Sequence, residues 1–219
     1  MFPISPSIAE TDIHHHDSVV ITFTGHDFRW FRDGLGPQPE FRGVLSKINT
    51  RFDKVYIVDV CKTWYLRNPI TERWNGYQYY RRLIKNITAS YKKVVLLGVS
   101  MGGYAPLLHA DLASYVISIS PQVNLDLEVS HAPPLRKRHA SMIPKKIRSY
   151  ALQYLVENVS SSNAIVDIHL GQNSLDQAHI KYLPDNVRVM QYQVQKHAIG
   201  KHMRDTGKLA LLIEKALKA

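Results

Sequence analysis

Short apolar runs alternate along this chain with segments in which apolar residues recur three and four positions apart. The runs are rich in Val, Ile and Tyr, which favours strands, and the spacing between them favours helices. The predicted strands are 18–25, 54–60, 93–100, 115–120, 164–170 and 186–194. The predicted helices are 76–90, 102–112, 144–158, 176–183 and 202–218. The pattern therefore predicts an α/β fold.

Four of the predicted strands are nearly continuous apolar runs, whereas a strand with one solvated face would alternate apolar and polar residues. Continuous runs are typical of a parallel sheet that is covered on both faces. We therefore expect a mostly parallel sheet of about six strands with helices on both faces. Such sheets place functional side chains at the carboxyl ends of their strands, so each candidate site residue should directly follow a strand.

The chain of 219 residues is long enough to bury one sizeable core, and no linker-like stretch divides it. We expect an N-terminal extension over 1–17 and a single domain over 18–219. The N-terminal residues do not have the pattern of a signal peptide, and no window has the length of a membrane span. Cys61 is the single cysteine, which excludes an internal disulfide. We expect a cytoplasmic protein.

One stretch, "VVLLGVSMGGYAPLLHADLA" at 94–113, places a serine between a predicted strand and a predicted helix. Its centre, 98–102, matches G-x-S-x-G, a pattern that occurs by chance in roughly one chain in fifteen of this length. The context is more specific, because the apolar strand leads directly to Ser100 and an apolar helical segment follows it. Glycines flank the serine because the backbone of such a turn is tight and strained. The stretch predicts a nucleophile elbow with Ser100 at its tip.

With this elbow, the chain resembles the α/β-hydrolase superfamily from Val19 onward. The likeness is to small members that include bacterial capsule polysaccharide O-acetyltransferases and related uncharacterised hydrolases. It rests on "GVSMGGYAPLL", "SPQ", "LDQAH" and a terminal "H" followed by "DTGKLALLIEKAL". The resemblance implies the α/β-hydrolase fold with a minimal lid and an acyl-enzyme at Ser100. It also implies a triad in the chain order serine, acid, histidine, with the histidine after the last strand.

His197 is the preferred histidine because it directly follows the last predicted strand, whereas His202 falls in the first turn of the final helix. Asp176, within "LDQAH", is the preferred acid. The other candidate acids are less well placed: Asp167 lies inside a predicted strand, and Asp185 belongs to the turn before the last predicted strand. In many members of the superfamily the acid lies about three residues beyond the glycine that ends the strand predicted here at 164–170. This chain has Ser174 at that place. Asp176 is also a candidate helix N-cap.

In this interpretation the histidine accepts the serine proton and the acid fixes the imidazole tautomer. Negative charge then develops on the carbonyl oxygen of the substrate. The backbone N–H of Met101 is one expected donor to that oxygen. The other is expected from the loop after the first predicted strand, near Gly25 and His26.

Two further segments follow predicted strands. Trp64 and Tyr65 could form a flat wall on which sugar rings stack, and Gln122 is expected near the pocket. The alternative for the two aromatic residues is that they cap the core. The basic segment 126–148 lies where this superfamily often inserts a lid, and its short length predicts an open cleft.

The 28 Lys and Arg residues exceed the 18 Asp and Glu residues, giving a net charge of +10 that attracts anions. No RNA-binding signature accompanies this charge, so we expect no specific nucleic-acid binding. The histidines and acids do not fall at metal-ligand spacing, so no metal site is expected.

Three functions remain open from the sequence. The first is an esterase or deacylase that acts on a small-molecule or glycan ester and uses no cofactor. The second is an O-acetyltransferase that moves acetyl from acetyl-CoA to a glycan hydroxyl, for which the positive charge would help to bind an anionic donor or acceptor. The third is a non-catalytic binding protein on the same fold.

Overall fold

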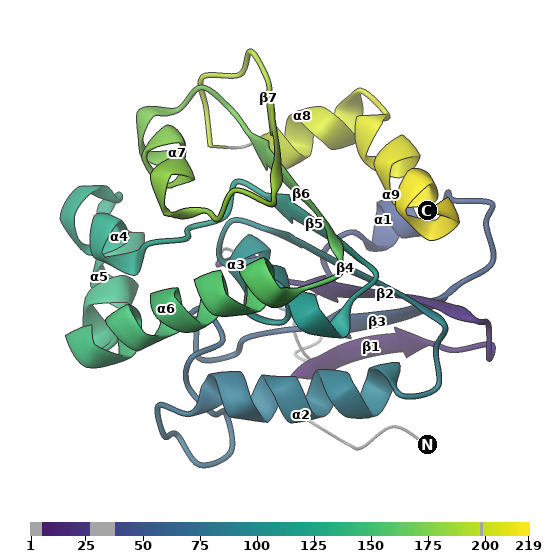
Figure 1. Cartoon of the computed structure of the whole chain (residues 1–219), viewed down its shortest axis with the longest axis horizontal. Helices are drawn as coiled ribbons and strands as arrows, with labels where there is room; N and C mark the ends of the chain where they lie inside the picture. The colour runs from purple at the N-terminus through teal and green to yellow at the C-terminus, as the bar shows by residue number, and fades with distance from the viewer. Residues whose placement is uncertain (1–5, 27–37, 198) are drawn as a thin grey trace.

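The centre of the computed structural model, which describes residues 6–26, 38–197 and 199–219, is a twisted sheet (Figure 1). Over these residues the sheet has seven strands in the order β1-β3-β2-β4-β5-β6-β7. They are β1 (Ile8–Asp12), β2 (Ser18–Phe23), β3 (Asp53–Ile57), β4 (Lys93–Val99), β5 (Tyr115–Ile119), β6 (Ile165–Leu170) and β7 (Arg188–Gln191). The pair β1–β3 is antiparallel and every other pair is parallel. The predicted mostly parallel sheet is confirmed.

Strand β1 lies within the segment 1–17, for which the sequence predicted an N-terminal extension. It pairs with β3, so that Thr11 lies opposite Val55 and Asp12 opposite Lys54. None of its residues is fully buried, as is common for an edge strand. Its short sequence, IAETD, therefore lacks the apolar run by which the other strands were predicted, and the sheet begins before residue 18.

Helices cover both faces of the sheet, as predicted (Figure 1). One face carries α2 (Gly76–Thr88), α3 (Met101–Leu108) and α6 (Lys145–Ser161). The other carries α1 (Arg42–Leu45), α8 (Ile199–Asp205) and α9 (Lys208–Lys218). Successive residues of a strand point to opposite faces, so Val94 and Leu96 pack in the first layer and Val95 and Leu97 in the second.

The remaining helices are short and lie in connections between strands. They are α4 (Leu125–His131), α5 (Pro134–Met142), α7 (Ser174–Ala178) and the 3-10 turns η1 (Ala110–Leu112) and η2 (Ile180–Tyr182). The predicted helix 202–218 is divided into α8 and α9 at Gly207, whose φ of 75° is left-handed. In the described part of the chain, none of the helices combines the length and the apolar character that a membrane span requires.

The turn from β4 into α3 depends on two glycines. A Cβ at Gly98 would lie 1.9 Å from the carbonyl oxygen of Gly102, and a Cβ at Gly102 would lie 2.2 Å from that of Phe23. Between them Ser100 has a φ of 57° and a ψ of −122°, outside the regions that L-residues normally occupy. The close approach of α3 to β4 and β2 therefore holds Ser100 in a strained conformation at the end of β4.

We predict that Gly98→Ala destabilises the protein, because its methyl group has no room beside the Gly102 carbonyl. The free energy of unfolding should fall by about 1–3 kcal/mol or more, measured by thermal or urea unfolding. Gly43→Ala in α1 is the matched control, since a Cβ there would meet nothing within 4 Å. Equal unfolding temperatures for the two variants would contradict the packing described for this turn.

Candidate active site

Ser100, His197 and Asp176 form a row of hydrogen bonds at the carboxyl ends of the strands. The Ser100 hydroxyl lies 2.7 Å from Nε2 of His197, and Nδ1 of His197 lies 2.7 Å from Oδ1 of Asp176. Ser100 follows β4, Asp176 lies in α7 after β6, and His197 follows β7. The Asp176 side chain is only 2% exposed, whereas that of His197 is 28% exposed. The structure thus brings together the three residues that the sequence favoured as nucleophile, acid and base.

Contacts between two loops set the position of the acid relative to the histidine. The backbone N–H of Gln172, after β6, donates to the carbonyl oxygen of Val194, after β7, at 2.7 Å. A Cβ at Gly171 would lie 2.5 Å from the same oxygen, so the small residue permits this close approach. Asn173 then caps α7, accepting from the N–H of Asp176 at 3.3 Å. The two loops therefore place Asp176 beside the histidine.

The alternative acids and the alternative histidine have other partners or positions. Asp167 accepts from the Tyr115 hydroxyl at 2.5 Å and from Nε of Arg188 at 2.6 Å. Burial, together with this carboxylate, raises the pKa of Tyr115 to about 12. Asp185 is exposed in the turn before β7. His202 lies in α8, where its ring contacts a tyrosine ring at 6.4 Å between centroids.

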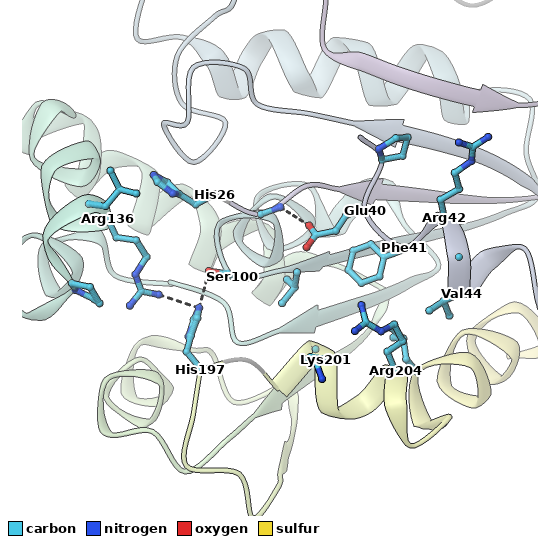
Figure 2. A pocket seen from close by; sticks show the side chains of 18 residues that line it. His26, Glu40, Phe41, Arg42, Val44, Ser100, Arg136, His197, Lys201 and Arg204 are labelled. Atoms are coloured by element: carbon cyan, nitrogen blue, oxygen red, sulfur yellow. Dashed lines mark hydrogen bonds between the residues drawn. The ribbon is translucent and has the colours of Figure 1, made fainter. Parts of the chain in front are cut away.

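Ser100 and His197 line a pocket of about 770 Å³ (Figure 2). The predicted lid segment 126–148, which forms α4, α5 and the start of α6, supplies part of the wall. Other lining residues come from the segment before α1 and from α8. Among the lining residues that the structure describes, four are Lys or Arg: Arg42, Arg136, Lys201 and Arg204. Of the same described residues one, Glu40, is a carboxylate, so positive charge dominates this part of the wall.

The expected oxyanion donors differ in their surroundings. Met101 is the first residue of α3, so its N–H is one of the helix N-terminal groups that have no partner within the helix. The N–H of Gly25 donates to the Glu40 carboxylate at 2.6 Å and is therefore already engaged. The His26 ring is buried and shares a hydrogen bond of 2.7 Å with the ring of His139. Burial and this neighbouring ring lower the pKa of His139.

Trp64 and Tyr65 do not form the predicted substrate wall, because both side chains are 0% exposed. The chain after β3 turns tightly around Asp59, whose carboxylate accepts from the N–H groups of Thr63 at 2.6 Å and Tyr65 at 2.8 Å. Trp64 and Tyr65 have φ values of 56° and 62° in this turn. The turn directs both rings into the core, which is the alternative that the sequence left open.

Gln122 is likewise 0% exposed and does not line the pocket. Its Oε1 accepts from Nε1 of Trp64 at 2.6 Å, and its Nε2 donates to Oε2 of Glu128 at 3.3 Å. Oε1 of Glu128 lies 3.2 Å from Nε2 of His179. The residue predicted to contact substrate therefore belongs to a buried polar network behind the pocket.

This network ends at Arg136, a residue that no pattern in the sequence distinguishes. Nε of Arg136 lies 3.4 Å from Oε2 of Glu128, and Nη1 lies 3.0 Å from Nε2 of His197. A guanidinium can only donate hydrogen bonds, so Nε2 accepts from Arg136 as well as from Ser100. His197 then carries its proton on Nδ1 and donates it to Asp176. The basic segment 126–148 was the available signal, but it does not indicate which cation points inward.

The residues that the structure describes contain no group of three or more His, Cys, Asp or Glu side chains that could hold a metal ion. The row of hydrogen bonds from Ser100 to Asp176 can activate a hydroxyl group. Ser100 is positioned to lose its proton to His197, and the imidazolium that results would be stabilised by the buried Asp176 carboxylate.

The sheet order, the serine at the β4–α3 turn, the acid after β6 and the histidine after β7 together define the α/β-hydrolase fold. The resemblance that the sequence predicted is therefore confirmed at the level of the fold. No protein-family model matches this sequence. No curated protein matches it significantly either.

Solved structures with this fold are similar to the chain at low sequence identity. The capsule O-acetyltransferase of Neisseria meningitidis serogroup A is 16% identical over 90% of this chain and 88% of that chain, with a TM-score of 0.59. A mutant of that enzyme is known in complex with CoA. Est1E from Butyrivibrio proteoclasticus is 11% identical over 97% and 93% of the two chains, with a TM-score of 0.58. A carboxylesterase structure from Nitrososphaera gargenis is 14% identical over 100% and 98%, with a TM-score of 0.56.

The geometry predicts that a fluorophosphonate probe labels Ser100, because His197 accepts its proton during attack. Asp176→Asn should slow labelling roughly 10³–10⁴-fold, since asparagine favours the wrong imidazole tautomer. Asp167→Asn is the matched control: it disturbs the contacts of Tyr115 and should lower the unfolding temperature while leaving the labelling rate unchanged. Equal labelling of wild type and Asp176→Asn would remove Asp176 from this role.

Proposed function

We propose that this protein is a serine esterase or deacylase that hydrolyses polar esters, a glycan ester among them, through an acyl-enzyme at Ser100. The observation that carries the proposal is the continuous row of hydrogen bonds from Ser100 through His197 to the buried Asp176. Its serine opens onto a pocket large enough for a small ester. The fold, which also occurs in esterases and in an O-acetyltransferase, agrees with chemistry of this kind.

In the first half of the reaction, the Ser100 oxygen bonds to the carbonyl carbon of the ester while its proton moves to Nε2 of His197. The carbonyl electron pair moves to the oxygen, where the N–H of Met101 is positioned as a donor. One such donor typically stabilises the transition state by about 2.7–4 kcal/mol. When the carbonyl re-forms, the bond to the alcohol breaks and the alcohol takes the proton from Nε2. In the second half of the reaction, water attacks the acyl-enzyme in the same way and gives its proton to His197. The carboxylic acid product leaves and the proton returns to Ser100.

Full use of the oxyanion site requires a change at Gly25. Its N–H faces the Glu40 carboxylate, which occupies a donor that this fold normally offers to the carbonyl oxygen. Rotation of the Glu40 side chain would release the N–H to the substrate. In the proposed mechanism, substrate entry and the displacement of Glu40 therefore occur together.

A second candidate function is O-acetyl transfer, in which a glycan hydroxyl replaces water and acetyl-CoA is the donor. The pocket favours this candidate through Lys201 and Arg204, two cations on the α8 side that could bind donor phosphates. The two candidates share the acyl-enzyme and differ only in the group that accepts the acyl. A non-catalytic binding protein, in contrast, would show no turnover that depends on Ser100.

Hydrolysis of p-nitrophenyl acetate tests the proposal. Ser100→Ala should lower kcat by several orders of magnitude, because Ser100 carries the only hydroxyl group among the described residues that line the pocket. Ser90→Ala, at an exposed serine, serves as the control and should retain wild-type kcat. If wild type and Ser100→Ala hydrolyse the ester equally slowly, the protein is not a serine esterase. Release of CoA from acetyl-CoA only when a glycan is added would favour transfer over hydrolysis.

A further inference from the structure

The Arg136 guanidinium lies at the place that the leaving alcohol must reach. Its Nη1 is 3.0 Å from Nε2 of His197. Nε2 of His197 is also 2.7 Å from the Ser100 hydroxyl. Figure 2 shows Arg136 and Ser100 both directed at this imidazole ring. In ester cleavage Nε2 must pass its proton to the oxygen of the departing alcohol. The guanidinium and the alcohol therefore compete for one position beside Nε2.

An ion pair with one buried carboxylate, that of Glu128, holds Arg136 there. The arginine side chain is only 15% exposed, and the Glu128 side chain that faces its Nε is 1% exposed. Glu128 is itself fixed by Gln122 at 3.3 Å and by His179 at 3.2 Å. A surface arginine would lose side-chain entropy on being held in this way, whereas this one is already ordered before a ligand arrives.

The contact between Arg136 and His197 cannot survive the first proton transfer. Once Nε2 has accepted the serine proton, both groups are hydrogen-bond donors and both are positively charged. Among the described residues, Glu128 then remains as an ion-pair partner 3.4 Å from Nε of Arg136. A largely buried cation that has lost its hydrogen-bond acceptor is costly. An anionic group on the substrate would supply that acceptor, because a planar guanidinium binds carboxylate and phosphate oxygens in pairs.

We infer that Arg136 selects esters whose alcohol part carries a carboxylate or a phosphate near the ester oxygen. This inference rests on the proposed function and names the substrate class of the same site. The anion draws the guanidinium away from Nε2 and sets the ester oxygen in its place. A neutral ester leaves Arg136 on His197 and reacts more slowly. The other cations among the described lining residues, Arg42, Lys201 and Arg204, extend the positive surface beyond this point.

The test compares kcat/KM for three acetyl esters of similar size: meta-acetoxybenzoate, meta-acetoxyphenyl phosphate and the neutral meta-acetoxybenzamide. Wild type should prefer the anionic esters by roughly 10–100-fold, the range of one charge-assisted hydrogen bond. The two anions distinguish a preference for carboxylate from one for phosphate. Arg136→Gln should reduce the preference to about onefold, whereas Arg136→Lys should retain part of it. Arg138→Gln, at an exposed arginine of the same helix, should keep the wild-type ratio.

Labelling of Ser100 with a neutral fluorophosphonate separates the two proposals. A labelled wild type with equal kcat/KM for all three esters overturns the selection by Arg136 and leaves the proposed esterase intact. An unchanged anion preference in Arg136→Gln has the same meaning. Absence both of labelling and of Ser100-dependent hydrolysis overturns the proposed function and, with it, this inference. Because a ratio of two esters is measured on one preparation, partial misfolding of a variant does not imitate the expected result.

Discussion

The close approach of α3 to β4 and β2 is the constraint on which the candidate site depends. At Gly98 and Gly102 there is no room for a Cβ, and the chain between them is forced into a positive φ at Ser100. A serine on a relaxed turn would have several orientations, whereas this one projects from the end of the strand toward His197. Backbone packing in the core thereby sets the direction of the Ser100 hydroxyl group. The apolar layers on both faces of the sheet offset the energetic cost of the strained backbone at this residue.

The parallel sheet brings the rest of the site to the same edge. Loops after β4, β6 and β7 meet there, and the contact between Gln172 and Val194 fixes two of them against each other. A second set of groups reaches the histidine from the opposite side. A chain of polar contacts starts in the core and ends at Nε2 of His197; it consists of Trp64, Gln122, Glu128 and Arg136. His197 is thus held by hydrogen bonds on both ring nitrogens.

Six of the seven described strands, and the positions of the three central residues after them, could be predicted from the sequence because each has a local signal. Apolar runs indicate buried parallel strands, and Ser100, Asp176 and His197 each follow one. Strand β1 lacks such a run because it lies at an edge. Trp64 also follows a strand, but this position does not predict whether its side chain points to the pocket or to the core. That direction depends on a left-handed turn around Asp59. Arg136 could not be distinguished from its basic neighbours in α5, because its orientation is set by Glu128, which lies in another helix.

The most direct measurement of the central claim is the mass of the peptide that contains Ser100 after brief reaction with p-nitrophenyl acetate and acid quenching. The mechanism predicts the added mass of one acetyl group on that peptide, located at Ser100 by fragmentation, with loss of the label on longer incubation in water. In Asp176→Asn the acetylated peptide should accumulate far more slowly. An acetyl group on another residue, or turnover of the ester with no acetylated peptide at any time, would contradict an acyl-enzyme at Ser100.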